Sequence, residues 1–189
     1  KQLGYLLHEG KLNNGGKNIE KLLGTFRERK GKEYRNKVKD WLKQNKNLNV
    51  IDYEVDISPK GHLEADKKYG DVDILVHDTK SNIVWSLECK DTNKAKNIHE
   101  MKKEMDNYLG RGEGKGMIKK HIDRHNWLNN NKDIICAFLK INEQIEVVSY
   151  MLTSEVIPTT YIKAEKLLMP IIAFPDLKRE GIELLYPAH

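Results

Sequence analysis

Two segments in the middle of the chain alternate between apolar and polar residues, as β-strands with one buried face do. In residues 71–76, apolar side chains occupy every second position from the first valine onward, and two aspartates point the opposite way. In residues 83–90, an isoleucine, a tryptophan, a leucine and a cysteine alternate with a set that ends in a glutamate and a lysine. Residues 77–82 between the two segments are largely polar, so the pattern predicts a β-hairpin.

The same periodicity predicts the elements around this hairpin. We expect helices at residues 18–30, 32–45, 93–109 and 117–128 and near 160–168, and strands at 49–57, 133–141 and 145–152. Gly31 separates the first two helices, and Pro158, Pro170 and Pro175 break up the C-terminal part. The predicted fold class is therefore α/β, with a central mixed β-sheet flanked by helices.

The hairpin predicts a cluster of charged groups. If its strands pair as the alternation suggests, Asp73 lies within a few angstroms of Glu88, and Lys90 shares the face of Glu88. Two carboxylates at that distance repel each other unless a cation lies between them, so the pair predicts a Mg²⁺ site that Mn²⁺ can also occupy. The alternative is an ordinary charged pair on a solvated strand face, which a bare Glu-x-Lys would favour. The Gly-Asp-x-Asp run at hairpin distance reduces the weight of that alternative.

The residues Gly70-Asp71-Val72-Asp73 and Glu88-Cys89-Lys90 resemble the two half-motifs of the PD-(D/E)xK nuclease superfamily, without its usual proline. The resemblance covers roughly residues 31–150. It implies a restriction-endonuclease-like core with the element order α-β-β-β-α-β.

The resemblance also implies roles for single residues. Asp73, Glu88 and the backbone carbonyl of Cys89 would hold the metal, and Lys90 would position the attacking water or stabilise charge in the transition state. Asp71 is a supporting or alternative acid. Glu33 matches the glutamate that often completes the metal site from the first core helix, although a glutamate in the first turn of a helix is equally explained by the helix dipole.

The charge distribution favours a polyanionic partner. The 189 residues contain 33 Lys and Arg against 28 Asp and Glu, which gives a net charge of +5, and the basic residues concentrate in residues 1–46 and 94–132. A lysine-rich composition shared by the whole proteome is an alternative source of this excess. The candidate nucleic-acid contacts are Lys94, Lys96, Arg111, Lys115, Lys119, Lys120 and Arg124.

Other kinds of site fit the sequence less well. The glycine-rich residues 110–116 lack the spacing of a phosphate-binding P-loop and follow a helix rather than a strand. His121 and His125 stand one helical turn apart, but Ile122 occupies the position of the glutamate in a zinc protease motif. The two cysteines, Cys89 and Cys136, suit reduced core thiols. No segment is long and apolar enough to span a membrane and no signal peptide is recognisable, so we expect a cytoplasmic protein.

Length and composition predict one compact domain. We expect an N-terminal helical extension at residues 1–30, a nuclease core at 31–152 and a C-terminal extension packing on the core at 153–189. Because the chain begins with Lys1, we expect it to be part of a longer protein with further domains.

The predicted function is that of a Mg²⁺-dependent endonuclease acting on DNA in restriction, phage defence or repair. The alternatives are a catalytically inactive nucleic-acid-binding module of the same fold and an RNA-cleaving nuclease. Whether the chain acts as a homodimer is left open.

Overall fold

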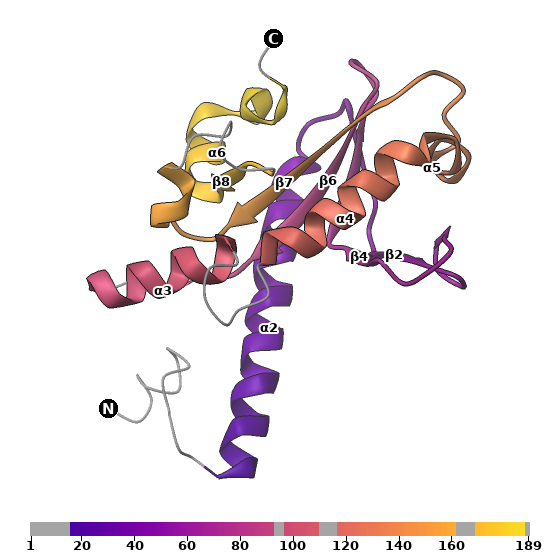
Figure 1. Ribbon diagram of the computed structural model, residues 1–189. Coiled ribbons are helices and arrows are strands. Elements are labelled where there is room, and N and C mark those ends of the chain that lie inside the picture. The colour runs from indigo at the N-terminus through magenta and orange to yellow at the C-terminus, as the bar shows by residue number, and fades with distance from the viewer. Residues whose placement is uncertain (1–15, 93–96, 110–116, 162–168, 188–189) are drawn as a thin grey trace.

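The structure is a computed structural model, and it describes residues 16–92, 97–109, 117–161 and 169–187, apart from the side chains of Asn107, Leu109 and Met117. Its helices are α2 (Lys17–Leu42), α3 (Ile98–Leu109), α4 (Met117–Asn130), α5 (Lys132–Leu139) and α6 (Phe174–Glu180), with short 3₁₀ segments η1 (Pro158–Tyr161) and η3 (Ile182–Leu185). Figure 1 shows these elements around a central sheet, with the N-terminal part of α2 projecting from the body of the molecule.

The main sheet has five strands in the order β1-β5-β6-β7-β8. They are β1 (Leu48–Val50), β5 (Ile74–Asp78), β6 (Ile83–Lys90), β7 (Glu146–Thr153) and β8 (Ile171–Ala173). β1, β5 and β6 pair antiparallel, whereas β6, β7 and β8 pair parallel. A smaller sheet, ordered β3-β2-β4, contains β2 (Val55–Ser58), β3 (Leu63–Glu64) and β4 (Gly70–Val72). Its strands lie between β1 and β5 in the sequence, although β1 and β5 pair directly with each other in the main sheet.

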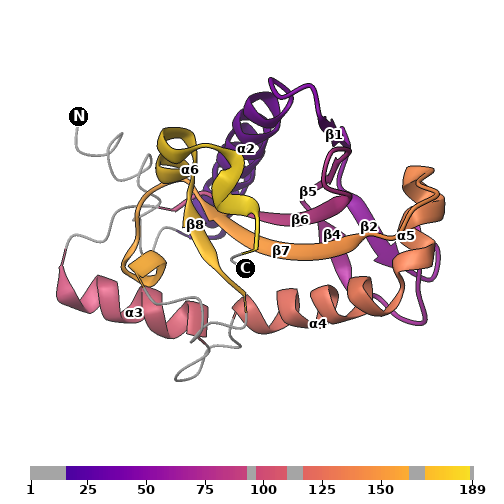
Figure 2. The same ribbon diagram turned by 90° about the horizontal axis from the view of Figure 1, so that it is seen from above.

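Helices cover both faces of the main sheet. Figure 2 shows α2 and α6 on one side and α3 and α4 on the other. On the first side, Tyr34, Val38 and Leu42 of α2 pack with Trp85 and Leu87 of β6 in one apolar core. On the second side, α4 and α5 pack over the small sheet and the opposite face of the main sheet in a separate core. The α/β class and the mixed sheet flanked by helices are therefore as predicted.

The hairpin that the sequence predicts is confirmed. β5 and β6 pair antiparallel with Ile74 opposite Leu87 and Asp78 opposite Ile83. Asn82, at the end of the connection, has a positive φ of 55°, which asparagine tolerates better than most residues. The strand predicted at 145–152 and the helices predicted at 93–109 and 117–128 are also present, as β7, α3 and α4, although residues 93–96 lie outside the described part of the chain.

The strand predicted over 71–76 is interrupted at Asp73. Val72 belongs to the core beneath α4, whereas Ile74 and Val76 belong to the core beneath α2. The chain passes from β4 in the small sheet to β5 in the main sheet at this residue. The predicted strand 49–57 is likewise divided between β1 in the main sheet and β2 in the small one. Alternation along one strand cannot distinguish a single sheet from two.

Two further predictions of local structure were wrong. Gly31 does not interrupt a helix, because α2 runs unbroken from Lys17 to Leu42. One glycine costs a helix only about 1 kcal/mol, which the packing of the C-terminal half of α2 offsets. Residues 132–139 form the helix α5 rather than a strand, with Ile135 and Leu139 buried one turn apart and Lys140 ending the helix at a φ of 58°. Short apolar runs do not by themselves distinguish the two.

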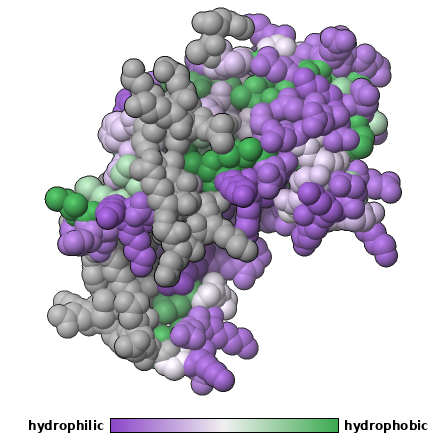
Figure 3. Space-filling model, in the orientation of Figure 1, coloured by the Kyte–Doolittle hydropathy of each residue, from purple (hydrophilic) through white to green (hydrophobic). Residues whose placement is uncertain are grey.

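The C-terminal residues complete the main core. Phe174, Leu177 and Leu185 are buried with the side chains of α2 and β6. The helix predicted near 160–168 begins as the 3₁₀ segment η1, and residues 162–168 lie outside the described part of the chain. Over the described residues, no helix has both the length and the apolar character needed to cross a membrane. In the view of Figure 3, the surface over α4 and the small sheet is mainly hydrophilic.

Candidate functional site

The hairpin brings two carboxylates together at the edge where β4 passes into β5. Asp73 immediately precedes Ile74, which pairs with Leu87, so Asp73 lies next to Glu88 of β6. The backbone N–H of Cys89 donates a hydrogen bond to Oδ2 of Asp73 at 2.8 Å. The Asp73 carboxylate is thereby fixed on β6 beside Glu88, as the sequence predicts.

Three basic side chains contact these acids. Nζ of Lys90 donates a hydrogen bond to Oε1 of Glu88. Nη1 of Arg124, from α4, donates to Oε2 of Glu88 at 3.0 Å. Nη1 of Arg35, from α2, donates to Oδ1 of Asp73 at 3.0 Å, and its Nη2 forms an ion pair with Glu54. Charged groups from both helical layers therefore meet where β5 begins and β6 ends.

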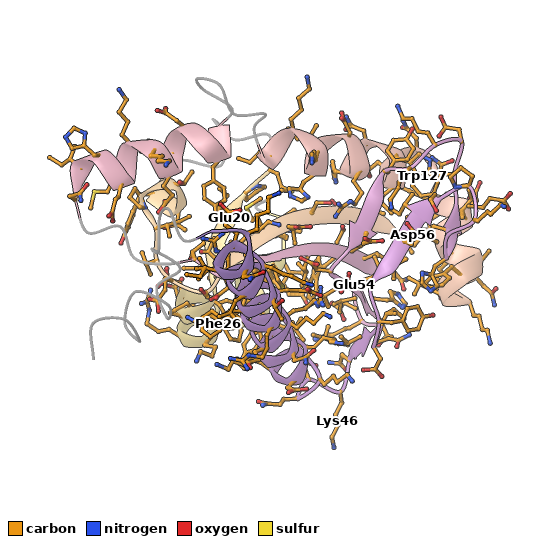
Figure 4. All side chains as sticks on the ribbon, turned by 90° about the horizontal axis from the view of Figure 1, so that it is seen from below. Glu20, Phe26, Lys46, Glu54, Asp56 and Trp127 are labelled. Carbon is orange, nitrogen blue, oxygen red and sulfur yellow. The ribbon has the colours of Figure 1, made fainter. Side chains whose placement is uncertain are left out.

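Asp73, Glu88 and Arg124 border an open cleft of about 660 Å³. Glu54, Asp71, Asp73, Glu88, Lys120 and Arg124 line it, together with Lys67, Lys68, Tyr69, Gly70 and Asp123. Figure 4 shows Glu54 close to the junction of the two sheets, on the side that faces α2. A pocket of this size with acids at its base and lysines at its rim can accept a charged ligand of nucleotide size.

Gly70 gives Arg124 the room that this arrangement needs. The backbone of Gly70 has a φ of +94°, which favours glycine, and a Cβ built there would lie 3.2 Å from Nη2 of Arg124. The glycine that begins the Gly-Asp-x-Asp run thus permits both the turn into β4 and the close approach of the guanidinium to Glu88.

Burial changes the acidity of two groups in the cluster. Burial first, and then the neighbouring charge of Glu88, raise the pKa of Asp73, and together they outweigh the opposing effects of the Cys89 N–H, Lys90 and Arg35. His121 of α4 lies 3.3 Å from Oε2 of Glu88 without hydrogen-bond geometry. Burial, followed by the positive charges of Arg124 and Lys90, lowers the pKa of His121 to about 3. His121 is therefore neutral at physiological pH.

The structure brings together Asp73, Glu88 and Lys90, and Asp71 lines the same cleft. It does not bring Glu33 to this group. Glu33 is exposed, lies 3.7 Å from Arg29 one turn earlier on α2, and borders a separate pocket against α6. The residue of α2 that reaches the carboxylates is Arg35 instead.

The predicted nucleic-acid contacts have different positions. Lys120 lines the cleft, and Lys119 is exposed on α4. Arg124 is buried and bonded to Glu88, so it lies inside the site rather than on an open helix face. Lys94, Lys96, Arg111 and Lys115 lie outside the described residues.

Sequence patterns did not identify Arg35, Glu54 or His121 as members of the site. Arg35 stands two positions from Glu33, which was chosen because it matches a family motif. Glu54 falls in the segment predicted to be a continuous strand. For Glu54, the sequence offers one signal, a charged residue within a segment predicted to be a paired strand. Such a signal points only weakly to a functional residue.

The predicted metal can be compared with the donor groups present. Among the described residues, no group of three or more His, Cys, Asp or Glu side chains is arranged to hold a metal ion. Magnesium often binds through one or two carboxylates and takes its other oxygens from water and substrate phosphates. The adjacent Asp73 and Glu88, with a carboxyl pKa raised partly by mutual repulsion, fit a site of that kind. His121 and His125 have different surroundings: Nδ1 of His125 is hydrogen-bonded to Ser149 at 2.8 Å, whereas Nδ1 of His121 lies 3.3 Å from Glu88.

Comparison with known proteins gives one match. No curated protein and no solved structure matches the chain. A family model described as "Anti-phage protein Upx-like" matches residues 20–172, a range that contains the small sheet, the main sheet up to Ile172, α4 and every residue of the charged cleft. Since the match extends over well more than half of the 189 residues, the chain belongs to the Upx-like family of anti-phage proteins.

Proposed function

We propose that this anti-phage protein is a metal-dependent nuclease that hydrolyses phosphodiester bonds of DNA in the charged cleft. The observation that carries the proposal is that Asp73 and Glu88 line one open cleft while Lys90 is hydrogen-bonded to Glu88. The order of elements that build the main sheet, α2-β1-β5-β6 followed by helices and β7, supports a restriction-endonuclease-like core. An anti-phage family is a setting in which cleavage of invading nucleic acid has a direct use.

The residues of the cleft divide the work. Asp73, Glu88 and the backbone carbonyl of Cys89 would hold Mg²⁺, which when bound supplies Lewis-acid stabilisation of the phosphate and a more acidic water. Lys90 has 32% side-chain exposure and is hydrogen-bonded to Glu88, and it would orient the attacking water or stabilise developing negative charge. Lys120 and Lys67, exposed at the rim, would hold the flanking phosphates.

Arg35 and Arg124 would keep the two carboxylates in place before substrate arrives. Arg35 joins Asp73 to Glu54, and Arg124 joins Glu88 to α4, so both acids have a fixed direction. Fixed groups lose less free energy on reaching the reactive geometry than mobile ones do.

A second candidate is a nucleic-acid-binding module without turnover. The same ion pairs favour it, because each carboxylate of the predicted metal site already has a basic partner within the protein. The two candidates differ in one measurable respect, which is whether the bound nucleic acid is cut.

Plasmid cleavage with Mg²⁺, with Mn²⁺ and with EDTA tests the proposal. We expect metal-dependent nicking that falls by about 10²- to 10³-fold in Lys90→Ala and at least as much in Asp73→Ala. Lys46→Ala is the matched control, because Lys46 is exposed and lies far from the cleft (Figure 4). Thermal unfolding followed by circular dichroism checks that each variant is folded.

If the folded wild-type protein binds DNA but does not cut it with metal present, the nuclease proposal is wrong and the binding module is the better explanation. Equal cutting by wild type and both variants would identify a contaminating nuclease. Single-stranded RNA in place of the plasmid tests the RNA-cleaving alternative.

A further inference from the structure

A second pocket lies directly beside the charged cleft. It has a volume of about 800 Å³ and is lined by residues 64–67, by Tyr69 and by the C-terminal half of α4. Lys67, Tyr69 and Asp123 border both the cleft and this pocket, so the two cavities adjoin. A nucleic-acid strand with a phosphate bound in the cleft would therefore pass the opening of the second pocket.

Aromatic side chains form one wall of this pocket. The rings of Tyr69 and Trp127 lie 5.8 Å apart between centroids and are tilted by 40°. Trp127 is buried and Tyr69 half-buried, which fixes the tyrosine ring from behind. Figure 4 shows Trp127 on α4 beside the small sheet. Nζ of the exposed Lys67 lies 5.0 Å from the centroid of the Tyr69 ring, and so flexible a side chain is readily displaced by a flat ligand.

Amides and carboxylates form the rest of the lining. Asn126 and Asn130 stand one turn apart on α4, and both are exposed. Neither side-chain amide makes a hydrogen bond to any part of the chain that the structure describes. Both amides are therefore free to bond a ligand, and each offers a donor and an acceptor.

The charge of the pocket is opposite to that expected of a phosphate site. Three carboxylates, those of Glu64, Asp66 and Asp123, line it with Lys67 as the single basic group among its lining residues. Such a lining repels a phosphate but accepts hydrogen bonds from the amino and imino groups of a base edge. An aromatic wall in the same pocket as hydrogen-bonding groups is the combination that holds an unpaired base.

We propose that this pocket binds an unpaired nucleobase carrying an exocyclic amino group, in the same strand whose phosphate occupies the charged cleft. The inference rests on the proposed function and extends it by naming how the substrate is selected. Tyr69 stacks on the base, and Asn126 and Asn130 bond its edge. The carboxylates favour cytosine, adenine or guanine over thymine, which has no amino group.

Equilibrium binding without metal tests the pocket independently of cleavage. The probes are fluorescent single strands of equal length, namely oligo-dC, oligo-dT and an abasic strand with the same phosphates, measured by anisotropy in EDTA. We expect wild type to bind oligo-dC about tenfold more tightly than the abasic strand, with oligo-dT between them.

Variants of the pocket assign that difference to its residues. The double variant Asn126→Ala/Asn130→Ala is expected to bring oligo-dC down to the affinity of the abasic strand, while affinity for the abasic strand stays unchanged. Tyr69→Ala is expected to weaken binding of oligo-dC more than binding of the abasic strand, because Tyr69 also borders the charged cleft. Asn49→Ala, an exposed asparagine on β1, is the matched control and is expected to bind like wild type.

Three results would overturn the nucleobase pocket. They are equal binding of oligo-dC and the abasic strand by wild type, an equal loss for both probes in the variants, and no binding of any probe. Cleavage of plasmid together with base-independent binding would refute the nucleobase pocket and support the nuclease proposal. Base-dependent binding without cleavage would support the nucleobase pocket and refute the nuclease proposal.

Discussion

The two faces of the main sheet are built from the same strands but have different chemistry. On the face covered by α2 and α6, β6 presents Trp85 and Leu87 to a continuous apolar core. On the face covered by α4, the same strand ends in Glu88 and Lys90, and Glu88 forms ion pairs with both Lys90 and Arg124. Because alternate side chains of one strand point in opposite directions, β6 supplies the core and the site at once.

The two faces of the main sheet are stabilised by different kinds of interaction. Apolar contacts need no particular direction, and their contribution grows with the area removed from water. The buried charges on the other face lose hydration and remain stable only through paired, directed contacts. Mutations on the first face should change the free energy of unfolding through packing, and those on the second through the loss of a partner.

The largest effect is expected for Trp85→Ala on the apolar face. Trp85 is fully buried, and truncating a buried tryptophan lowers the free energy of unfolding by about 3–5 kcal/mol. Urea denaturation measures the change. Ser86→Ala, at the next position and on the opposite face, is the control and is expected to change stability by no more than about 1 kcal/mol. Similar losses in both variants would contradict the contrast between the faces.

Arg124→Leu tests the charged face. Removing one partner of a buried ion pair leaves Glu88 poorly compensated and should cost about 3 kcal/mol. Arg124→Leu combined with Glu88→Leu should recover part of this loss, since both charges are then gone. Urea denaturation of the single and double variants decides the matter, and a double variant less stable than Arg124→Leu would refute the explanation.

A smaller loss is expected for Gly70→Ala, about 1–3 kcal/mol, because alanine is strained at a φ of +94° and its Cβ crowds Arg124. Gly24→Ala is the control, since Gly24 is exposed within α2 and has open space around it. This control should raise stability by up to about 1 kcal/mol. Thermal unfolding compares the two, and an equally stable Gly70→Ala protein would exclude a requirement for glycine.

Asp78 is a charged residue buried on the otherwise apolar face of the main sheet. Burial raises its pKa, but hydrogen bonds from Ser81, Tyr186 and the N–H of Lys80 outweigh burial and leave the pKa below the ordinary value of 3.8. The resulting stability is fully present above pH 3.8 and is lost as pH falls through the lowered pKa.

Asp78→Asn should therefore be less stable than wild type by about 1 kcal/mol at neutral pH, and the difference should shrink as the pH falls below 3.8. Urea denaturation over that range of pH measures it. Tyr186→Phe, which removes one of the three donors, should show a smaller effect in the same direction. A difference independent of pH would show that the charge of Asp78 is not the cause.

The sequence by itself determined the hairpin and the pairing of its charged residues. The alternation over 83–90, broken only at Val84, and a polar connection favour the register that buries the apolar set, and that register places Asp73 beside Glu88. The α/β class followed for the same reason, because helical and strand periodicities differ clearly in long segments.

Only the tertiary structure decided which distant residues complete the site. Arg35, Glu54 and Arg124 are separated from the hairpin by loops and helices, and their positions depend on how α2, the small sheet and α4 pack against the main sheet. Local periodicity also failed for residues 132–139, where a short apolar run satisfies a helix as well as a strand. Alternation fixes which way a side chain points along its own strand, whereas contact between separate elements is set by packing that no local pattern encodes.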